Sequence, residues 1–123
     1  MAGKASILLI DDEENLRRTL AMILVREGYV VETAATIKEA RERVEASTYD
    51  LVFLDLKLPD ANGLSLLPDL RRRFPNTPVL ILTAHDKLDS AVEAVRQGAR
   101  DYLLKPLDPP VIIKRVKDVL AEK

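Results

Sequence analysis

The stretch LLIDDEE, residues 8–14, sets three apolar residues directly before four carboxylates. The pattern returns in LVFLDLKLPDANG, residues 51–63, where an apolar run ends at Asp55. A short, wholly apolar run bounded by charge is typical of a strand buried on both faces of a parallel sheet. One acidic strand end is common, because carboxylates stabilise the start of a following helix. Two such ends predict that acidic groups gather at one edge of a sheet.

The rest of the chain alternates between short apolar runs and helical periodicity. We expect strands at residues 6–10, 29–33, 51–54, 79–82 and 101–104, with one amphipathic helix after each. Strict alternation of strand and helix favours a parallel sheet that carries helices on both faces, with right-handed connections. The sequence therefore predicts an α/β fold, in which ligands bind beyond the carboxyl ends of the strands.

Several residues predict where helices begin and end. Thr36 and Glu39 have the spacing of a capping box, and Asp108 before Pro109 predicts an N-cap with proline at the first helical position. Pro68 lies within an apolar helical pattern, so we expect that helix to start late or to have a distorted first turn. Gly28 and Gly98 predict two helix ends. Gly63 predicts that the loop after Asp55 turns or passes close to the acidic edge of the sheet.

Two further patterns concern helix surfaces. Leu88, Ala91, Val92 and Val95 recur at helical spacing and predict one apolar stripe along a helix. The three arginines at residues 71–73 predict a solvated helix face rather than a nucleic-acid-binding patch.

Length and composition limit the classes of protein that fit. With 123 residues, 47% hydrophobic and 32% charged, the chain is expected to form a single domain, residues 1–123. A formal net charge of −1 provides no overall basic surface for nucleic acid. The lack of cysteine excludes disulfides and thiolate metal sites, and it fits a reducing compartment. No apolar run reaches the roughly 20 residues that cross a bilayer, so we expect a cytoplasmic protein without membrane association.

Chemically useful side chains follow four of the five expected strands. Asp11 and Asp12 follow the first, Asp55 the third, Thr83 the fourth and Lys105 the fifth. Carboxylates that lie together stay ionised only when cations offset their repulsion, and Lys105 supplies one positive charge. Mg²⁺ prefers carboxylate oxygens and water, and a site with Mg²⁺, an ammonium and a hydroxyl suits phosphoryl transfer. We expect Asp55, which stands alone at its strand end, to be the nucleophile that forms an aspartyl phosphate.

Four stretches in this order, LLIDDEE, LVFLDLKLPDANG, LILTAH and DYLLKP, resemble the receiver domain of two-component response regulators. The resemblance covers essentially the whole chain, and residues 82–108 look most like receivers of the nitrogen-regulation (NtrC-like) type. It implies a doubly wound (βα)5 three-layer sandwich, flavodoxin- and CheY-like, with parallel strand order 2-1-3-4-5.

The resemblance also implies which residues form the site. It assigns the phosphoacceptor to Asp55 and the acidic pair to Asp11 and Asp12, with Asp12 touching Mg²⁺ directly and Asp11 through water. The backbone carbonyl of Lys57 would be a further metal ligand. The side chains of Lys57 and His85 would flank the phosphoryl group and tune its hydrolysis. The alternative for these two is a solvated lysine and a surface histidine.

Three further residues would respond to the phosphoryl group. In the family the switch hydroxyl falls on Thr83, the phosphate-binding lysine on Lys105 and the switch aromatic on Tyr102. The peptide between Lys105 and Pro106 would be cis, which an X–Pro bond adopts at modest cost. The simpler alternatives are a strand threonine, a surface lysine and a half-buried packing tyrosine.

These roles imply a phospho-accepting signalling switch. A histidine kinase would phosphorylate Asp55, and the face built from residues 88–97, 101–104 and 111–120 would then control an output domain or partner protein in transcription regulation. The resemblance also implies a phosphorylation-dependent dimer and no direct nucleic-acid binding by this domain. The domain would be no enzyme in the usual sense, because it would assist only its own phosphorylation and dephosphorylation.

Three other functions are compatible with parts of the pattern. A Mg²⁺-dependent phosphohydrolase would need a second catalytic acid or base near Asp55 and a cap region that selects its substrate. The residue two positions after Asp55 is Lys57, which does not fit that requirement. A receiver-like module that only binds a protein partner should lack a site residue, and none is missing. A flavin-binding protein of similar topology would need a loop rich in Ser, Thr and Gly after the first strand, where this chain has acids.

Overall fold

The computed structural model describes residues 4–122, except the side chain of His85. In this part of the chain, five parallel strands form one sheet in the order β2-β1-β3-β4-β5, which confirms the expected order. The strands are β1 (Ser6–Ile10), β2 (Val30–Ala34), β3 (Leu51–Asp55), β4 (Val79–Thr83) and β5 (Asp101–Leu104). The order reverses between β1 and β3, so the carboxyl ends of these two strands flank the switch point where ligands bind.

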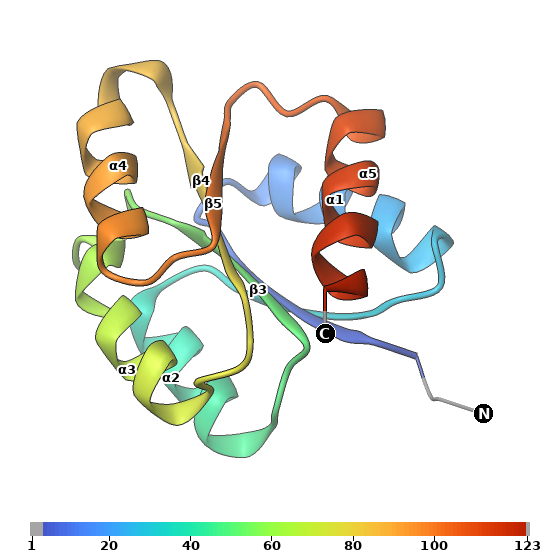
Figure 1. The fold of residues 1–123 in the computed structure, drawn as a ribbon, viewed down its shortest axis with the longest axis horizontal. Helices are drawn as coiled ribbons and strands as arrows, with labels where there is room; N and C mark the ends of the chain where they lie inside the picture. Colours follow the sequence, from blue (N-terminus) through green and yellow to red (C-terminus); the bar gives the residue numbers. More distant parts are fainter. Residues whose placement is uncertain (1–3, 123) are drawn as a thin grey trace.

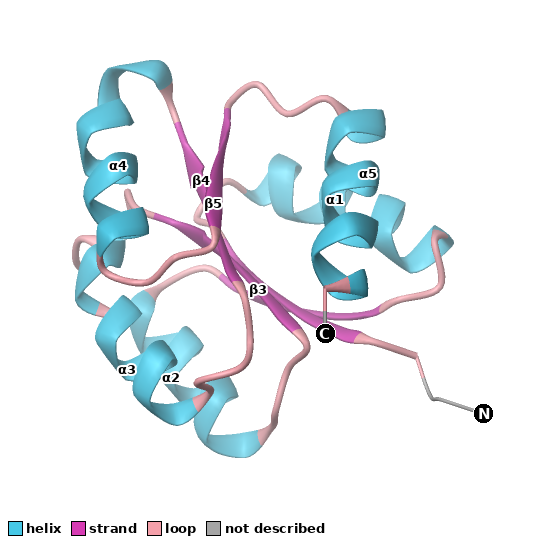
Figure 2. Ribbon diagram, in the orientation of Figure 1, coloured by secondary structure: helices cyan, strands magenta, loops and turns pink. Residues whose placement is uncertain are grey.

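The helices cover both faces of the sheet and make three layers. On one face lie α1 (Glu14–Arg26) and α5 (Pro109–Ala121), and on the other lie α2 (Ile37–Ala46), α3 (Leu67–Arg73) and α4 (Leu88–Arg96) (Figures 1 and 2). Two short 3-10 turns, η1 (Gly63–Ser65) and η2 (His85–Lys87), precede α3 and α4. The expected doubly wound α/β architecture is confirmed.

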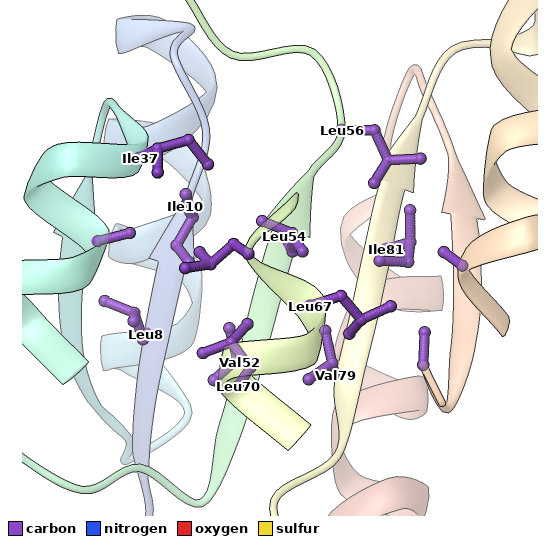
Figure 3. Packing of buried hydrophobic residues seen from close by; sticks show 14 of the residues in the cluster. Leu8, Ile10, Ile37, Val52, Leu54, Leu56, Leu67, Leu70, Val79 and Ile81 are labelled. Atoms are coloured by element: carbon purple, nitrogen blue, oxygen red, sulfur yellow. The ribbon is translucent and has the colours of Figure 1, made fainter. Parts of the chain in front are cut away.

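Alternate residues of the central strands point to opposite faces, so the sheet supports two cores. On one face, Val52 and Leu54 of β3 belong to a buried cluster with Ile37 of α2 and Leu67 of α3 (Figure 3). On the other face, Phe53 belongs to a cluster with residues of α1 and α5. Strands β3 and β4 are buried along their whole length. Burial on both faces explains why these strands are continuous apolar runs in the sequence.

The N-terminus of α2 is capped from two sides. Thr36 Oγ1 accepts a hydrogen bond from the Glu39 amide at 3.0 Å, as the capping-box spacing predicts. The Glu39 carboxylate accepts from the amide of Ala35, one residue before the N-cap, at 2.8 Å. Asp60, in the loop after β3, accepts from the first two amides of the helix at 2.9 and 3.1 Å. The last contact ties the loop after Asp55 to α2.

Prolines shape the starts of two helices. Pro68 occupies the first turn of α3, which begins at Leu67 after η1, so the late start predicted from this proline is confirmed. Asp108 is the N-cap of α5, but its side chain makes no capping hydrogen bond within the described residues. Pro110, the second helical residue, has no amide hydrogen to donate, which removes one of the two amides that an N-cap side chain normally accepts from.

The apolar stripe predicted on α4 does not form a single buried face. Only Ala91 of the four residues is buried, together with Ala94, whereas Leu88, Val92 and Val95 are 39%, 40% and 38% exposed. Small alanine side chains let the helix approach β4 and β5 closely, and the larger side chains are left toward solvent. The structure therefore leaves an apolar surface on α4.

The sequence predicted a solvated helix face at the arginines of residues 71–73, but one of the three is not solvated. Arg71 is half-buried and donates to the carbonyls of Thr77 at 2.8 Å and Pro75 at 2.7 Å. Arg71 thereby holds the loop between α3 and β4, because those carbonyls have no strand partner of their own. Within residues 4–122, no helix combines the length and the apolar character that crossing a membrane requires.

Candidate functional site

Three carboxylates meet at the carboxyl edge of the sheet. Asp11 follows β1 directly, Asp12 comes next, and Asp55 is the last residue of neighbouring β3. One carboxylate oxygen of each lies within 4.8 Å of the others. Asp11 is fully buried and Asp55 is 4% exposed, whereas Asp12 is exposed to solvent. The acidic groups gather because β1 and β3 are adjacent parallel strands that end at the same level.

Lys105, which follows β5, brings a positive charge among these carboxylates. Its Nζ lies 3.0 Å from Asp11 Oδ2, 3.0 Å from Glu13 Oε1 and 3.2 Å from Asp55 Oδ2. The lysine side chain is only 18% exposed, so water screens these ion pairs less than on an open surface. The peptide between Lys105 and Pro106 is cis.

Backbone amides orient two of the carboxylates. Asp11 Oδ1 accepts from the Glu13 amide at 2.8 Å, and Asp55 Oδ1 accepts from the Lys57 amide at 3.0 Å. Both are Asx turns, which aspartate readily forms with the amide two residues on. Arg17 of α1 donates from Nη1 to the carbonyl of Asp11 at 2.8 Å, so the helix also holds this loop. In both aspartates the second carboxylate oxygen lies beside Lys105.

The acidic pair does not serve as a helix cap. The N-cap of α1 is Glu13, and its side chain makes no capping hydrogen bond within the described residues. The fully buried Asp11 instead uses one oxygen for its own turn and directs the other to Lys105. The simple capping explanation of two consecutive aspartates is therefore insufficient.

Burial changes the protonation of these groups. It raises the pKa of Asp11 from 3.8 to about 6, with a contribution from the charge of Asp55, against the opposing effects of the Glu13 amide and Lys105. Burial also raises the pKa of Asp55, although the Lys57 amide and Lys105 oppose it. Burial alone would lower the pKa of Lys105, but its carboxylate neighbours outweigh that effect and hold the pKa above its usual range. The site is short of positive charge.

The donor set fits a hard divalent cation. Asp11 Oδ2 lies 3.0 Å from the lysine nitrogen without the angles of a hydrogen bond, and among the described residues this buried oxygen has no hydrogen-bond partner. A buried carboxylate oxygen in that position is unfavourable unless another charge offsets it. Oxygens of Asp12 and Asp55 lie close enough to share one ion with it. Such hard oxygen donors are the ligands that Mg²⁺ and Ca²⁺ accept.

A cavity of about 270 Å³ opens beside Asp55. Asp12, Thr83 and Lys105 also line it, so side chains from the carboxyl ends of four different strands share one space. Thr83 is buried, and its hydroxyl donates at 3.2 and 3.4 Å to two carbonyls of the loop after β4. In this state the hydroxyl is directed toward the loop and its donor is engaged there.

The other predicted site residues lie around this centre. The side chain of Lys57 is exposed at the rim of the cavity. Tyr102 is half-buried on β5 and packs against the core on the α2, α3 and α4 side, away from the lining of the cavity. The side chain of His85 lies outside the described residues.

Sequence reasoning missed three charged residues of the cavity. Glu13 contacts Lys105, and Asp86 and Lys87 line the cavity wall. The run of four acids in LLIDDEE was a signal for Glu13, since a carboxylate so close to the acidic pair shares its edge of the sheet. Asp86 and Lys87 belong to η2, a turn that no periodicity announces.

Comparison with known proteins agrees with this geometry. Residues 7–117 match the model of the family described as the response regulator receiver domain. The chain belongs to the response regulator receiver domain family. This membership confirms the resemblance carried by the four sequence stretches. It also places the chain in a family of signalling receivers rather than of enzymes with separate substrates.

This receiver domain is similar to parts of larger regulators. It is 45% identical over 107 residues to the alginate biosynthesis transcriptional regulatory protein AlgB of Pseudomonas putida, covering 87% of this chain and 24% of AlgB. It is 36% identical over 105 residues to the DNA-binding transcriptional regulator NtrC of Proteus hauseri, covering 85% of this chain and 22% of NtrC. The chain thus spans about a quarter of the length of these relatives.

A solved structure supports the same assignment. The crystal structure of the receiver domain of NtrX from Brucella abortus superimposes with a TM-score of 0.90 at 33% identity, covering 95% of this chain and 99% of that one. Similarity to both NtrC and NtrX agrees with the nitrogen-regulation type of receiver that residues 82–108 resemble.

Proposed function

We propose that this receiver domain is a switch that accepts a phosphoryl group on Asp55 from a histidine kinase. The observation that carries the proposal is the contact of Asp55 with Lys105 beside Asp11 and Asp12, at the wall of a cavity. Asp11 is fully buried and does not line the cavity, whereas Asp55 is held by the Lys57 amide and does line it. These differences favour Asp55 as the nucleophile.

In the proposed transfer, an oxygen of Asp55 attacks the phosphorus of the donor and forms an O–P bond. The bond between phosphorus and the donor atom breaks, and its electron pair leaves on the imidazole nitrogen of a phosphohistidine or on acetate. Lys105 donates to one phosphoryl oxygen, and the Thr83 hydroxyl turns from the loop carbonyls to another. In hydrolysis, water attacks the phosphorus, the O–P bond to Asp55 breaks, and inorganic phosphate leaves.

The proposed metal site consists of Asp11, Asp12, Asp55 and the backbone carbonyl of Lys57, with Mg²⁺ as the ion. The exposed Asp12 would bind the ion directly, and the buried Asp11 through water. Mg²⁺ held there would offset the negative charge of the carboxylates and of the phosphoryl group. The unpartnered Asp11 Oδ2 and the raised pKa of Asp11 support this assignment, because both reflect missing positive charge.

The proposed output surface is the face of α4, β5 and α5. Movement of Thr83 toward the phosphoryl group would let Tyr102 swing inward and reshape this face, which then controls an output domain, a partner or a phosphorylation-dependent dimer. The exposed apolar side chains of α4 support the proposal, because monomeric proteins rarely leave contiguous apolar surface without a partner. AlgB and NtrC are named as transcriptional regulators, and we propose transcription regulation as the output here.

The proposal covers the whole of residues 1–123 as one receiver domain in the cytoplasm, with no nucleic acid bound by this domain itself. The phosphoryl lifetime would be tuned by the side chains of Lys57 and His85, which stand two residues after Asp55 and Thr83. Replacing each with alanine and timing the loss of phosphate tests this role, and unchanged lifetimes would contradict it. The alternative function is that of a receiver-like module that binds a protein partner without phosphorylation.

The decisive experiment is intact mass after incubation with Mg²⁺ and acetyl phosphate. The parent protein should gain one labile phosphoryl group, and the gain should disappear in Asp55→Asn and when Mg²⁺ is withheld. Asp89→Asn, which removes an exposed carboxylate of α4, is the matched control and should keep the gain. No gain in the parent at saturating donor would support the binding-module alternative instead.

A further inference from the structure

The ammonium group of Lys105 has three N–H donors and three carboxylate neighbours. Two of the neighbours, Asp11 and Asp55, belong to the proposed metal and phosphoryl site. The third, Glu13, has no part in it, although its Oε1 lies as close to the lysine nitrogen as Asp11 does. The contacts with Glu13 and Asp55 are hydrogen bonds, and the contact with Asp11 is an ion pair at 3.0 Å, so three carboxylates surround the phosphate-binding ammonium before a phosphoryl group arrives.

The contact of Glu13 with Lys105 is not explained by helix capping. Glu13 occupies the N-cap position of α1, yet its side chain does not bond to the helix amides. Instead the side chain lines the cavity that contains Asp55 and Thr83. It is 60% exposed, whereas the lysine side chain is 18% exposed. Glu13 can consequently leave the lysine and enter water, while the lysine stays in the site.

We propose that Glu13 competes with the phosphoryl group for Lys105 and so favours the unphosphorylated state. The inference rests on the proposed function, because it concerns the phosphoryl group on Asp55. A phosphoryl oxygen needs a donor from this ammonium, and a carboxylate on the same ammonium repels the incoming negative charge. Each phosphorylation therefore breaks the contact of Glu13 with Lys105, and each dephosphorylation restores it. Glu13 acts through the lysine and is a positioning residue.

The expected effect is modest, because an exposed ion pair is weak. Removing the Glu13 charge should lower the acetyl phosphate concentration for half-maximal phosphorylation by about two- to fivefold, as expected for a partly exposed pair. The maximal extent of labelling should change little, since Asp55, Thr83 and Lys105 are retained. This split between half-saturation and maximum distinguishes competition from damage to the site.

The test compares Glu13→Gln with Glu14→Gln, which removes the same charge one residue further on. Glu14 is 72% exposed and lies near Arg18, not near Lys105, so it reports the general effect of a lost negative charge. Half-saturation is measured by intact mass at rising acetyl phosphate with saturating Mg²⁺. The inference predicts a decrease in Glu13→Gln alone. An equal decrease in both variants, or no decrease, would overturn it.

A second measurement tests the contact without any phosphodonor. In protein labelled with ¹⁵N-lysine, the Nζ signal of Lys105, assigned through Lys105→Arg, should shift in Glu13→Gln and stay in place in Glu14→Gln. An unshifted signal in Glu13→Gln would overturn the inference even with the proposed function intact. If the parent protein itself gains no phosphoryl group at saturating donor, the proposed function fails and the competition fails with it.

Discussion

Asp11 is a residue of the proposed metal site whose buried charge lowers the free energy of unfolding. Its carboxylate is fully buried, one oxygen has no hydrogen-bond partner among the described residues, and its pKa is raised to about 6. A carboxyl group whose pKa is higher in the folded than in the unfolded state binds more protons when folded. It therefore makes the protein less stable as the pH rises from about 4 to about 6.

We expect Asp11→Asn to stabilise the protein in the absence of divalent cations. At pH 7.5 the gain in the free energy of unfolding should be on the order of 2 kcal/mol, because the variant buries no charge there. At pH 4 the gain should be much smaller, since the parent carboxyl is then protonated. Urea unfolding in EDTA at both pH values measures this difference. Asp12→Asn, at an exposed position, is the control and should change stability little.

Asp11→Asn should also remove the response to Mg²⁺. In the parent protein, Mg²⁺ bound at the proposed site should stabilise the folded state and raise the midpoint of thermal unfolding. In the variant the midpoint should be nearly independent of Mg²⁺, because a carboxylate of the proposed site is lost. If Asp11→Asn is less stable than the parent in EDTA at pH 7.5, the buried charge of Asp11 does not destabilise the folded protein and the prediction is wrong.

Gly63 is required for a different reason, close approach of two backbone segments. A Cβ atom at this position would clash with the carbonyl oxygen of Asp55 and lie 2.8 Å from Cα of Leu56. Gly63→Ala should therefore lower the free energy of unfolding by about 2–3 kcal/mol, as overpacking does. Urea unfolding tests this against Gly28→Ala, where a Cβ meets nothing within 4 Å and only the positive φ of 98° is unfavourable. Equal losses in the two variants would contradict the steric argument.

At the scale of elements, the loop after β3 depends on a helix that lies outside the site. Asp60 in this loop accepts hydrogen bonds from two amides at the start of α2, and these bonds hold its pKa below the ordinary value. The same loop directly follows Asp55, contains Lys57 and leads to Gly63. The cap therefore positions the segment that carries the proposed nucleophile and one proposed metal ligand.

Asp60→Ala should loosen both the start of α2 and the loop. Hydrogen exchange of the Ile37 and Lys38 amides should become faster, because their acceptor is lost. Glu42→Gln, on the exposed surface of the same helix, is the control and should leave these amides unchanged. The pH dependence has the opposite sign to that of Asp11: the stabilisation is present above the ordinary pKa and is lost as the pH falls through the lowered one. Unchanged exchange in Asp60→Ala would contradict the role of the cap.

For the molecule as a whole, the layered fold separates the site from the proposed output surface. The site lies at the carboxyl edge of the sheet, whereas the exposed apolar residues lie on the solvent-facing surface of α4. In the proposed switch, a signal between them would pass through β4, whose last residue Thr83 lines the cavity, and β5, which carries Tyr102. Phosphorylation would shift a balance between two arrangements of this face that already exist.

We expect Val92→Ser to separate partner binding from stability. Val92 is 40% exposed, so its replacement should change the free energy of unfolding by less than about 0.5 kcal/mol. It should weaken any self-association that acetyl phosphate induces, as measured by size-exclusion chromatography with light scattering. Met22→Ser, at an apolar residue of α1 that is 59% exposed, is the matched control on the other layer. Equal weakening by both variants would contradict the assignment of the output surface to α4.

Much of this domain could be predicted from the sequence, because the relevant signals are local. Apolar strands such as residues 51–54 and the capping box of Thr36 and Glu39 depend only on near neighbours, and strict alternation restricts the topology to few choices. Strand ends in a parallel sheet share one edge, so the meeting of Asp11, Asp12 and Asp55 follows from the order of the strands. The family resemblance rests on the same residues.

Other features exist only because distant segments meet in the tertiary structure. Glu13 and Lys105 are 92 residues apart, Asp60 caps a helix that starts 23 residues earlier, and no local pattern encodes either contact. The burial of Ala91 rather than Val92 on α4 depends on how closely the helix approaches β4 and β5. The sequence determined the order of elements and the chemistry of their ends. Packing determined which charges pair and which apolar side chains stay exposed, because both depend on the neighbours that folding supplies.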